Sequence, residues 1–182
     1  MKPTFDKIAE IYDRFNADTA AYRREAACAK GCAFCCSDAG AIDITTLEGL
    51  VIREQISRMP RTRQASIKKT LARDMKKRRA GNISPCPFLT KTKTCMIYAA
   101  RPFVCRRIYS LHACSKEKPA LIRRQVMDLA KQSISTLQRL DENGYSGHIS
   151  YILHMLEAPK FLNTSLSGGF KPEEIMVFGK HH

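Results

Sequence analysis

Four cysteines fall within nine residues of this 182-residue chain, and this cluster constrains the fold more than any other part of the sequence. The stretch reads CAKGCAFCC at residues 28–36, with its last two cysteines adjacent. Four more cysteines follow at positions 86, 95, 105 and 114, so the chain holds two groups of four. Thiols this closely spaced require an explanation in disulfide, redox or metal chemistry.

A disulfide framework is disfavoured. The N-terminal stretch MKPTFDKIAEIYDRF is charged every few residues and lacks the apolar segment of a secretory signal. We therefore expect a cytoplasmic protein, in which thiols stay reduced. In addition, adjacent cysteines cannot easily close on each other without a strained peptide.

Redox use of a single pair and simple burial of thiols are weaker alternatives. Cys32 and Cys35 form a CxxC, but a thioredoxin-like CxxC belongs in a βαβ unit that this sequence does not show. Unrelated buried thiols would not gather four to a nine-residue window. Metal ligation is thus favoured, and sulfur ligands select zinc, copper(I) or iron–sulfur clusters.

Apolar residues recur at helical spacing along most of the chain, which predicts a mainly α fold. Thr45 and Glu48 form a capping box that predicts the start of the second helix. Pro119 suits the first turn of the fourth helix. The helices are expected at residues 4–26, about 46–58, 62–79, 119–141 and about 147–157.

The cysteines lie largely outside these helices. Residues 82–118 carry three prolines and are expected to form loops with one or two short helical turns. We predict a single small helical domain over residues 1–158, with an irregular cysteine-rich loop region stapled by metal. Residues 159–182 are expected to form an extended, loosely packed C-terminal tail.

The later cysteines lie in two distinctive stretches, CPFL at 86–89 and CMIYAARPFVCR at 95–106. Together with CAKGCAFCC they resemble the YkgJ-type cysteine-cluster family, a zinc- or iron-chelating domain named for its CxxCxxCC pattern. The outline of that family is C-x3-C-x2-C-C, then CPFL, then C-x-I-Y-x-x-R-P-x-x-C-R. Every element occurs here in order, and the resemblance covers about residues 20–115.

The resemblance implies metal binding rather than one particular reaction. Some relatives act as lysine methylases on flagellin, but this short chain shows no methyl-donor site, so whether it is an enzyme stays open. Cys114 lies outside the motif, and its role as a ligand rests on the cysteine count alone. The ligands that the resemblance implies are Cys28, Cys32, Cys35, Cys36, Cys86, Cys95 and Cys105.

An iron–sulfur cluster, with [4Fe–4S] as the first choice, is favoured over zinc. The Cys86-Pro87 pair is similar to the Cys-Pro that follows a cluster ligand in bacterial ferredoxins. Zinc ribbons use paired CxxC knuckles, and only one CxxC occurs here. Arg101 and Arg106 flank Cys105 and are candidate cofactor-binding residues, because nearby cations stabilise an anionic centre. For Arg101, a salt bridge or a helix cap is an equally open role.

The chain is strongly basic, with a net charge of +14 and a pI near 9.6. Ten of its basic residues and one acidic residue fall between positions 58 and 80. A solvated helix face is the favoured explanation, and an anionic partner at residues 58–79 is the alternative. Nucleic acid is not favoured as that partner, because the segment has no aromatic residue for base stacking.

The sequence therefore predicts a metal-binding protein whose cluster is structural or transfers electrons, working with a partner protein. Three alternatives stay open: a zinc-binding interaction module, a cluster-dependent redox or protein-modifying enzyme, and a nucleic-acid binder. No membrane association is expected, because no apolar run approaches the roughly 20 residues that span a bilayer.

Overall fold

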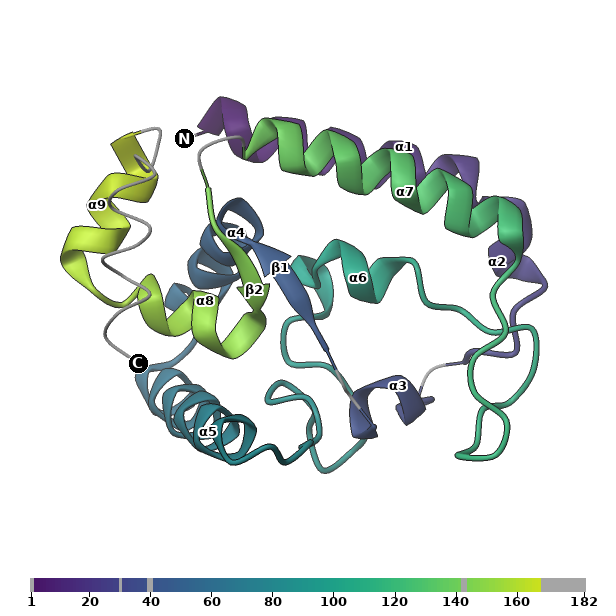
Figure 1. Cartoon of the computed structure of the whole chain (residues 1–182), viewed down its shortest axis with the longest axis horizontal. Helices are drawn as coiled ribbons and strands as arrows, with labels where there is room; N and C mark the ends of the chain where they lie inside the picture. Colours follow the sequence, from purple (N-terminus) through teal and green to yellow (C-terminus); the bar gives the residue numbers. More distant parts are fainter. Residues whose placement is uncertain (1, 30, 39–40, 142–143, 168–182) are drawn as a thin grey trace.

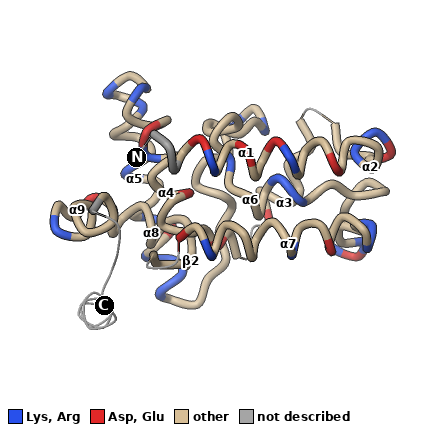
Figure 2. The backbone as a smooth tube through the Cα atoms, turned by 90° about the horizontal axis from the view of Figure 1, so that it is seen from above, with Lys and Arg blue, Asp and Glu red and all other residues tan. Residues whose placement is uncertain are grey.

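The structure of the chain is a computed structural model that describes residues 2–29, 31–38, 41–141 and 144–167. It is mainly α, as the sequence predicted, and five of its helices form two packed groups (Figure 1). Helices α1 (Lys2–Asp18) and α7 (Arg124–Leu140) lie side by side along one edge of the molecule (Figures 1 and 2). The second group consists of α4 (Thr46–Ser57), α5 (Arg61–Arg79) and α8 (Ile149–Met155).

The remaining elements are further helical segments and two short strands. They are α2 (Ala20–Arg24), α3 (Phe34–Ser37), η1 (Tyr98–Ala100), α6 (Phe103–Arg106), α9 (Pro159–Ser167) and the strands β1 (Asp43–Thr45) and β2 (Ser146–His148). The strands pair antiparallel, with Ile44 opposite Gly147. The sequence did not predict this sheet, because three-residue strands are too short to leave a recognisable alternation of apolar and polar residues.

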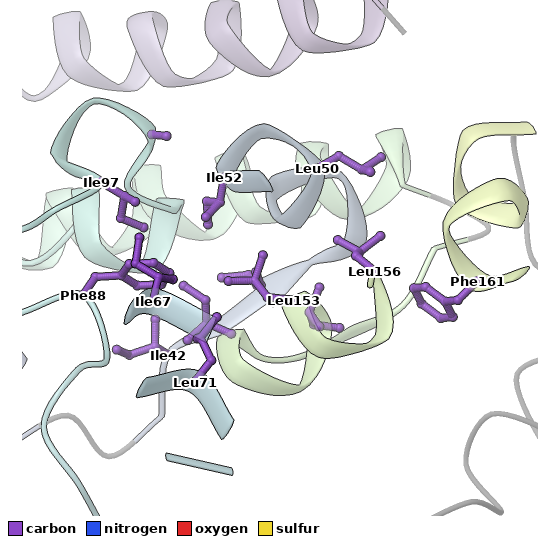
Figure 3. Packing of buried hydrophobic residues seen from close by; sticks show 14 residues of the cluster. Ile42, Leu50, Ile52, Ile67, Leu71, Phe88, Ile97, Leu153, Leu156 and Phe161 are labelled. Carbon is purple, nitrogen blue, oxygen red and sulfur yellow. The ribbon is translucent and has the colours of Figure 1, made fainter. Parts of the chain in front are cut away.

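The larger hydrophobic core lies between α4, α5 and α8 and extends into the cysteine-bearing loops (Figure 3). Ile52 is fully buried there, together with Phe88 and Ile97 from the loop region. Helices α4 and α8 approach closely at Gly49, where a Cβ atom would lie 2.7 Å from a side-chain carbon of Ile152. A larger residue at position 49 would therefore push these helices apart.

A second core joins α1 and α7 to the loop region. Ile8 and Phe15 of α1 are buried against Val126 and Leu137 of α7. Phe103, at the start of α6, belongs to the same cluster, and its ring lies edge-on to that of Phe15 with centroids 4.7 Å apart. The helix pair thus packs directly on the segment that carries Cys105.

The expected helix at 4–26 is divided in two at Thr19. This residue is fully buried, and its hydroxyl donates a hydrogen bond of 2.6 Å to the carbonyl of Phe15, one turn back. The expected helix at 119–141 begins later, at Arg124. Before it, the Leu111 N–H donates to the Leu121 carbonyl, at 3.0 Å, so Pro119 lies in a paired loop rather than in a first helical turn.

The expectation of an extended tail from residue 159 was wrong over the described part of that segment. Residues Pro159–Ser167 form α9, and Phe161 is fully buried in the larger core. The rest of the expected tail, 168–182, lies outside the described residues. Within the described residues, none of the helices combines the length and apolar character needed to cross a bilayer.

The capping box of α4 is confirmed, and its glutamate does more than cap a helix. The Thr45 hydroxyl accepts from the Glu48 N–H at 3.2 Å, and a Glu48 carboxylate oxygen accepts from the Thr45 N–H at 3.0 Å. The other carboxylate oxygen accepts from the Tyr12 hydroxyl at 2.8 Å and from the Phe103 N–H at 2.7 Å. Since Glu48 is only 4% exposed, this one carboxylate holds α1, α4 and α6 together in the interior.

Burial raises the pKa of the Tyr12 phenol, and the negative charge of Glu48 raises it further. The phenol therefore stays protonated and available as a donor. The Arg106 guanidinium lies over the Tyr12 ring, 4.0 Å from its centroid.

Replacing Glu48 by alanine is expected to lower the free energy of unfolding by about 3 kcal/mol or more, because buried donors on three elements lose their acceptor. The measurement is chemical denaturation followed by circular dichroism. Glu54→Ala is the matched control in the same helix. Its carboxylate is half exposed in an ion pair with Arg58, so its loss is expected to cost less than about 1 kcal/mol. Equal losses in both variants would contradict the role assigned to Glu48.

Candidate metal centre

The first four cysteines lie on an exposed turn followed by the single-turn helix α3. The Cys32 N–H donates to the Ala29 carbonyl at 2.9 Å, and Gly31 has a φ of +92°. This φ lies in the left-handed region, which glycine adopts at little cost. Cys35 and Cys36 follow within α3.

Cys86 and Cys95 lie at the two ends of a small hairpin. An isolated antiparallel bridge joins Leu89 to Cys95, and the Met96 N–H donates to the Phe88 carbonyl at 2.9 Å. The sulfur atoms of Cys86 and Cys95 each accept a backbone hydrogen bond from two residues downstream, from Phe88 and Ile97 respectively. Such N–H donors stabilise a thiolate, so the backbone here favours the ligand form of cysteine.

Cys105 lies in the short helix α6, and Glu48 holds the start of that helix through the Phe103 N–H. The first and second cysteine segments meet directly, because the Cys86 N–H donates to the Cys36 carbonyl at 2.7 Å. Cysteines far apart in the sequence are thereby brought into one region of the molecule.

We distinguish two sets of cysteines by which thiols raise or lower the pKa of one another. Cys35, Cys36, Cys86, Cys95 and Cys105 influence one another and are called the inner thiols below. Cys28, Cys32 and Cys114 are called the outer thiols. Burial raises the pKa of Cys28, and the charges of Cys32 and Cys114 raise it further. Cys35 influences members of both sets and so stands between them.

The outer set forms because two chain segments run alongside each other. The Ala27 N–H donates to the Ser110 carbonyl at 2.8 Å, and the Ser110 N–H donates to the sulfur of Cys28 at 3.2 Å. Cys114 follows four residues later, and its thiol lies 3.8 Å from the His112 carbonyl oxygen. Cys114, whose role as a ligand rested on the cysteine count alone, therefore lies close to the first cysteine segment.

Burial is the main cause of the raised pKa values of Cys28, Cys86, Cys95 and Cys105. It raises the pKa of Cys86 to about 11 and that of Cys105 to about 12, with neighbouring thiols adding to the effect. Cys35 is the exception, because a hydrogen bond from the Cys36 thiol lowers its pKa to about 6. The donor Cys36 has a correspondingly raised pKa. The thiols with raised pKa values, such as Cys86 and Cys105, are neutral at pH 7 and release their protons when a metal ion binds them.

Arg101 is a cation whose charge acts on the inner thiols. Its charge favours the thiolates of Cys35, Cys95 and Cys105, and its guanidinium lies 4.2 Å from the centroid of the exposed Tyr98 ring. The Nε atom of Arg101 is buried and has no hydrogen-bond partner among the described residues.

Arg106 contacts the backbone instead. It donates to the carbonyls of Arg101 and Ala99, each at 2.9 Å, and so holds the segment that carries Arg101.

All eight thiols are free. Among the residues that the structure describes, no three cysteine, histidine or acidic side chains converge closely enough to ligate one ion. The donor chemistry nevertheless fits zinc or an iron–sulfur cluster, because the shared region offers sulfur atoms with backbone N–H donors and a nearby arginine.

Comparison with family models gives one match, to CxxCxxCC, described as a putative zinc- or iron-chelating domain, over residues 27–123. The matched segment is 97 of the 182 residues, more than half of the chain, and includes all eight cysteines. The chain belongs to the CxxCxxCC family. No curated protein and no solved structure matches it.

The CxxCxxCC region depends on a second buried carboxylate, which the sequence analysis missed as a functional residue. Asp74, 3% exposed, accepts a hydrogen bond from the Ser84 hydroxyl, two residues before Cys86. It also accepts from the Ser150 hydroxyl at 2.6 Å and from Arg78 Nε at 3.0 Å. Asp74 thus connects α5, α8 and the loop that leads to Cys86.

A signal for Asp74 was present in the sequence. It is the only acidic residue of the basic helix, and it lies seven residues after Ile67 and three after Leu71, on the face that turns inward. A charged residue on an apolar face requires a partner in the interior.

Asp74→Asn is expected to be less stable than the natural chain at neutral pH, and the difference should shrink in acid. Burial alone would raise the pKa of Asp74, but hydrogen bonds from Ser150, Ser84 and Arg78 lower it below its ordinary value of 3.8. The unfolded chain then binds the proton first, so the stabilisation present above pH 3.8 is lost as the pH falls below that value. Urea titrations of both proteins at neutral pH and near pH 3 measure the difference. A gap that widens in acid would contradict this account.

Proposed function

We propose that the inner thiols of this CxxCxxCC protein hold an iron–sulfur cluster that is structural or transfers electrons to a partner protein. The observation that carries the proposal is the meeting of three cysteine segments, at 35–36, 86–95 and 105, around one buried region. Such a cluster supplies one-electron redox chemistry or a rigid cross-link between loops. The chain itself contributes the sulfur ligands, their N–H donors and the charge of Arg101, with Arg106 fixing the segment that carries Arg101.

Five inner thiols exceed the four that one cubane cluster or one zinc ion binds. We infer that the outer thiols, with Cys35 between the two sets, provide a second and more exposed place for metal. Both sets together account for all eight cysteines as ligands. A cytoplasmic location, in which the thiols stay reduced, is part of the proposal.

The single decisive experiment is purification without oxygen, followed by iron, sulfide and zinc analysis with absorption and electron spin resonance spectra. We expect a brown protein with stoichiometric iron and sulfide, and a broad absorption band at the blue end of the visible range that bleaches on reduction. A colourless protein with stoichiometric zinc would show instead that the chain is the alternative zinc-binding module. A protein that binds neither metal under these conditions would refute the proposal.

A matched pair of cysteine variants separates the two thiol sets. Cys105→Ser removes an inner ligand and is expected to lose most of the bound metal. Cys114→Ser removes an outer ligand and is expected to keep the inner centre, with at most a partial loss of total metal. Circular dichroism of both variants controls for folding. If Cys114→Ser loses as much metal as Cys105→Ser, the division into two sets is wrong.

A further inference from the structure

Helix α5 presents an outer face on which positive charge is not balanced. Its inward face carries Ile67, Leu71, Asp74 and Met75, which are all buried. The one acidic residue of the helix is therefore withdrawn from the surface and already engaged by Arg78. The charged residues that α5 exposes to solvent are all Lys or Arg.

Most cations on this face have no anionic partner among the described residues. Lys68 pairs with Glu157 at 2.9 Å. In the part of the chain that the structure describes, six others are exposed and form no ion pair: Arg61, Arg63, Lys69, Arg73, Lys76 and Lys77. A helix face that served only for solubility would usually mix both signs of charge.

Three of these cations form a line along the helix, which we call the cationic stripe: Lys69, Arg73 and Lys76. Their spacing of four and three residues places them on one side of α5 over about 10 Å. The neighbouring outward positions hold small residues, among them Ala65, Ser66 and Ala72. A flat or convex partner can therefore come close to the three charges.

We propose that the cationic stripe binds the phosphate backbone of a nucleic-acid duplex, without reading its sequence. Lys and Arg are the residues that contact phosphate oxygens, and a chain with a pI of 9.6 and a basic helix face has the corresponding electrostatic pattern. No aromatic residue lies on α5, which excludes the base stacking that holds single strands.

The same residues argue against other anionic partners. The centres of protein interfaces are enriched in aromatic residues, methionine and arginine and depleted in lysine, whereas two of the three stripe residues are lysines. Helices that lie on membranes insert Trp, Phe or Leu into the lipid, whereas the larger apolar residues of α5 are turned into the core. The phosphate backbone of a duplex carries a regular negative charge. It suits a helix face that exposes positive charge and small residues but no large apolar side chain.

The stripe lies far from the α1–α7 edge of the molecule (Figure 1), and this separation provides a matched control. The test variant is Lys69→Glu/Arg73→Glu/Lys76→Glu. The control is Lys7→Glu/Arg14→Glu/Lys131→Glu, which reverses two lysines and one arginine on the exposed surfaces of α1 and α7. Both variants lower the formal net charge equally, from +14 by 6 to +8.

The experiment measures fluorescence anisotropy of labelled DNA and RNA duplexes of about 20 base pairs, which exceed the roughly 28 Å length of α5. Binding is measured over a range of salt concentrations, with the metal-loaded natural chain and both variants. We expect the logarithm of the natural chain's affinity to fall with that of salt concentration, by about 0.9 for each phosphate contacted. The stripe variant is expected to bind at least about tenfold more weakly, and the slope of log affinity against log salt concentration is expected to be smaller in magnitude by about 3. The affinity of the control is expected to change less than about threefold.

Binding of either duplex with this pattern supports the proposal, and the DNA and RNA arms identify which duplex is preferred. Three results would overturn it: equal losses in both variants, tighter binding of single strands than of duplexes, or displacement of the duplex by polyglutamate as effectively as by unlabelled duplex. Equal metal content and equal circular dichroism in the three proteins ensure that a loss of binding does not reflect a lost metal centre or a lost fold.

Discussion

The buried carboxylate of Glu48 is the interaction on which the arrangement of this protein depends most. It receives hydrogen bonds from Tyr12 of α1, from Thr45 at the start of α4 and from Phe103 at the start of α6. A carboxylate in the interior is stable only with such donors. Phe103 lies two residues before Cys105. The single Glu48 carboxylate therefore caps α4, joins the two helix groups and positions one inner thiol.

Asp74 has the same role on the other side of the thiols. It fixes Ser84 before Cys86 and connects α5 with α8. The two carboxylates thus hold the segments of two inner thiols against a rigid helical frame, while the loop at 28–36 is held mainly by contacts with other loops. Rigid ligands on one side and an exposed ligand loop on the other suit a site that a metal completes.

Patterns within one helix or motif were predictable from the sequence. The capping box at Thr45 and Glu48 marks the start of α4, the apolar spacing marks α5, and the CxxCxxCC outline marks the candidate ligands. Contacts between distant segments were not predictable, because no local pattern reveals that Ser110 donates to the sulfur of Cys28. The late start of α7 at Arg124 has the same cause, since pairing of Leu111 with Leu121 replaces the helical turn at Pro119. Phe161 likewise gave no periodic signal in its short segment.

The hydrogen bond between the Cys86 N–H and the Cys36 carbonyl joins residues 50 positions apart. Closing a loop of that length costs conformational entropy, so such contacts form only when other interactions have gathered the chain. The contacts of Glu48 with Phe103 and of Asp74 with Ser150 close loops of 55 and 76 residues, which are longer still. The inner thiols therefore come together only as the whole domain folds, and an unfolded chain displays them scattered. Biosynthesis of the protein therefore requires that the thiols are protected until folding and that metal is supplied at that point. The finished protein has neither requirement.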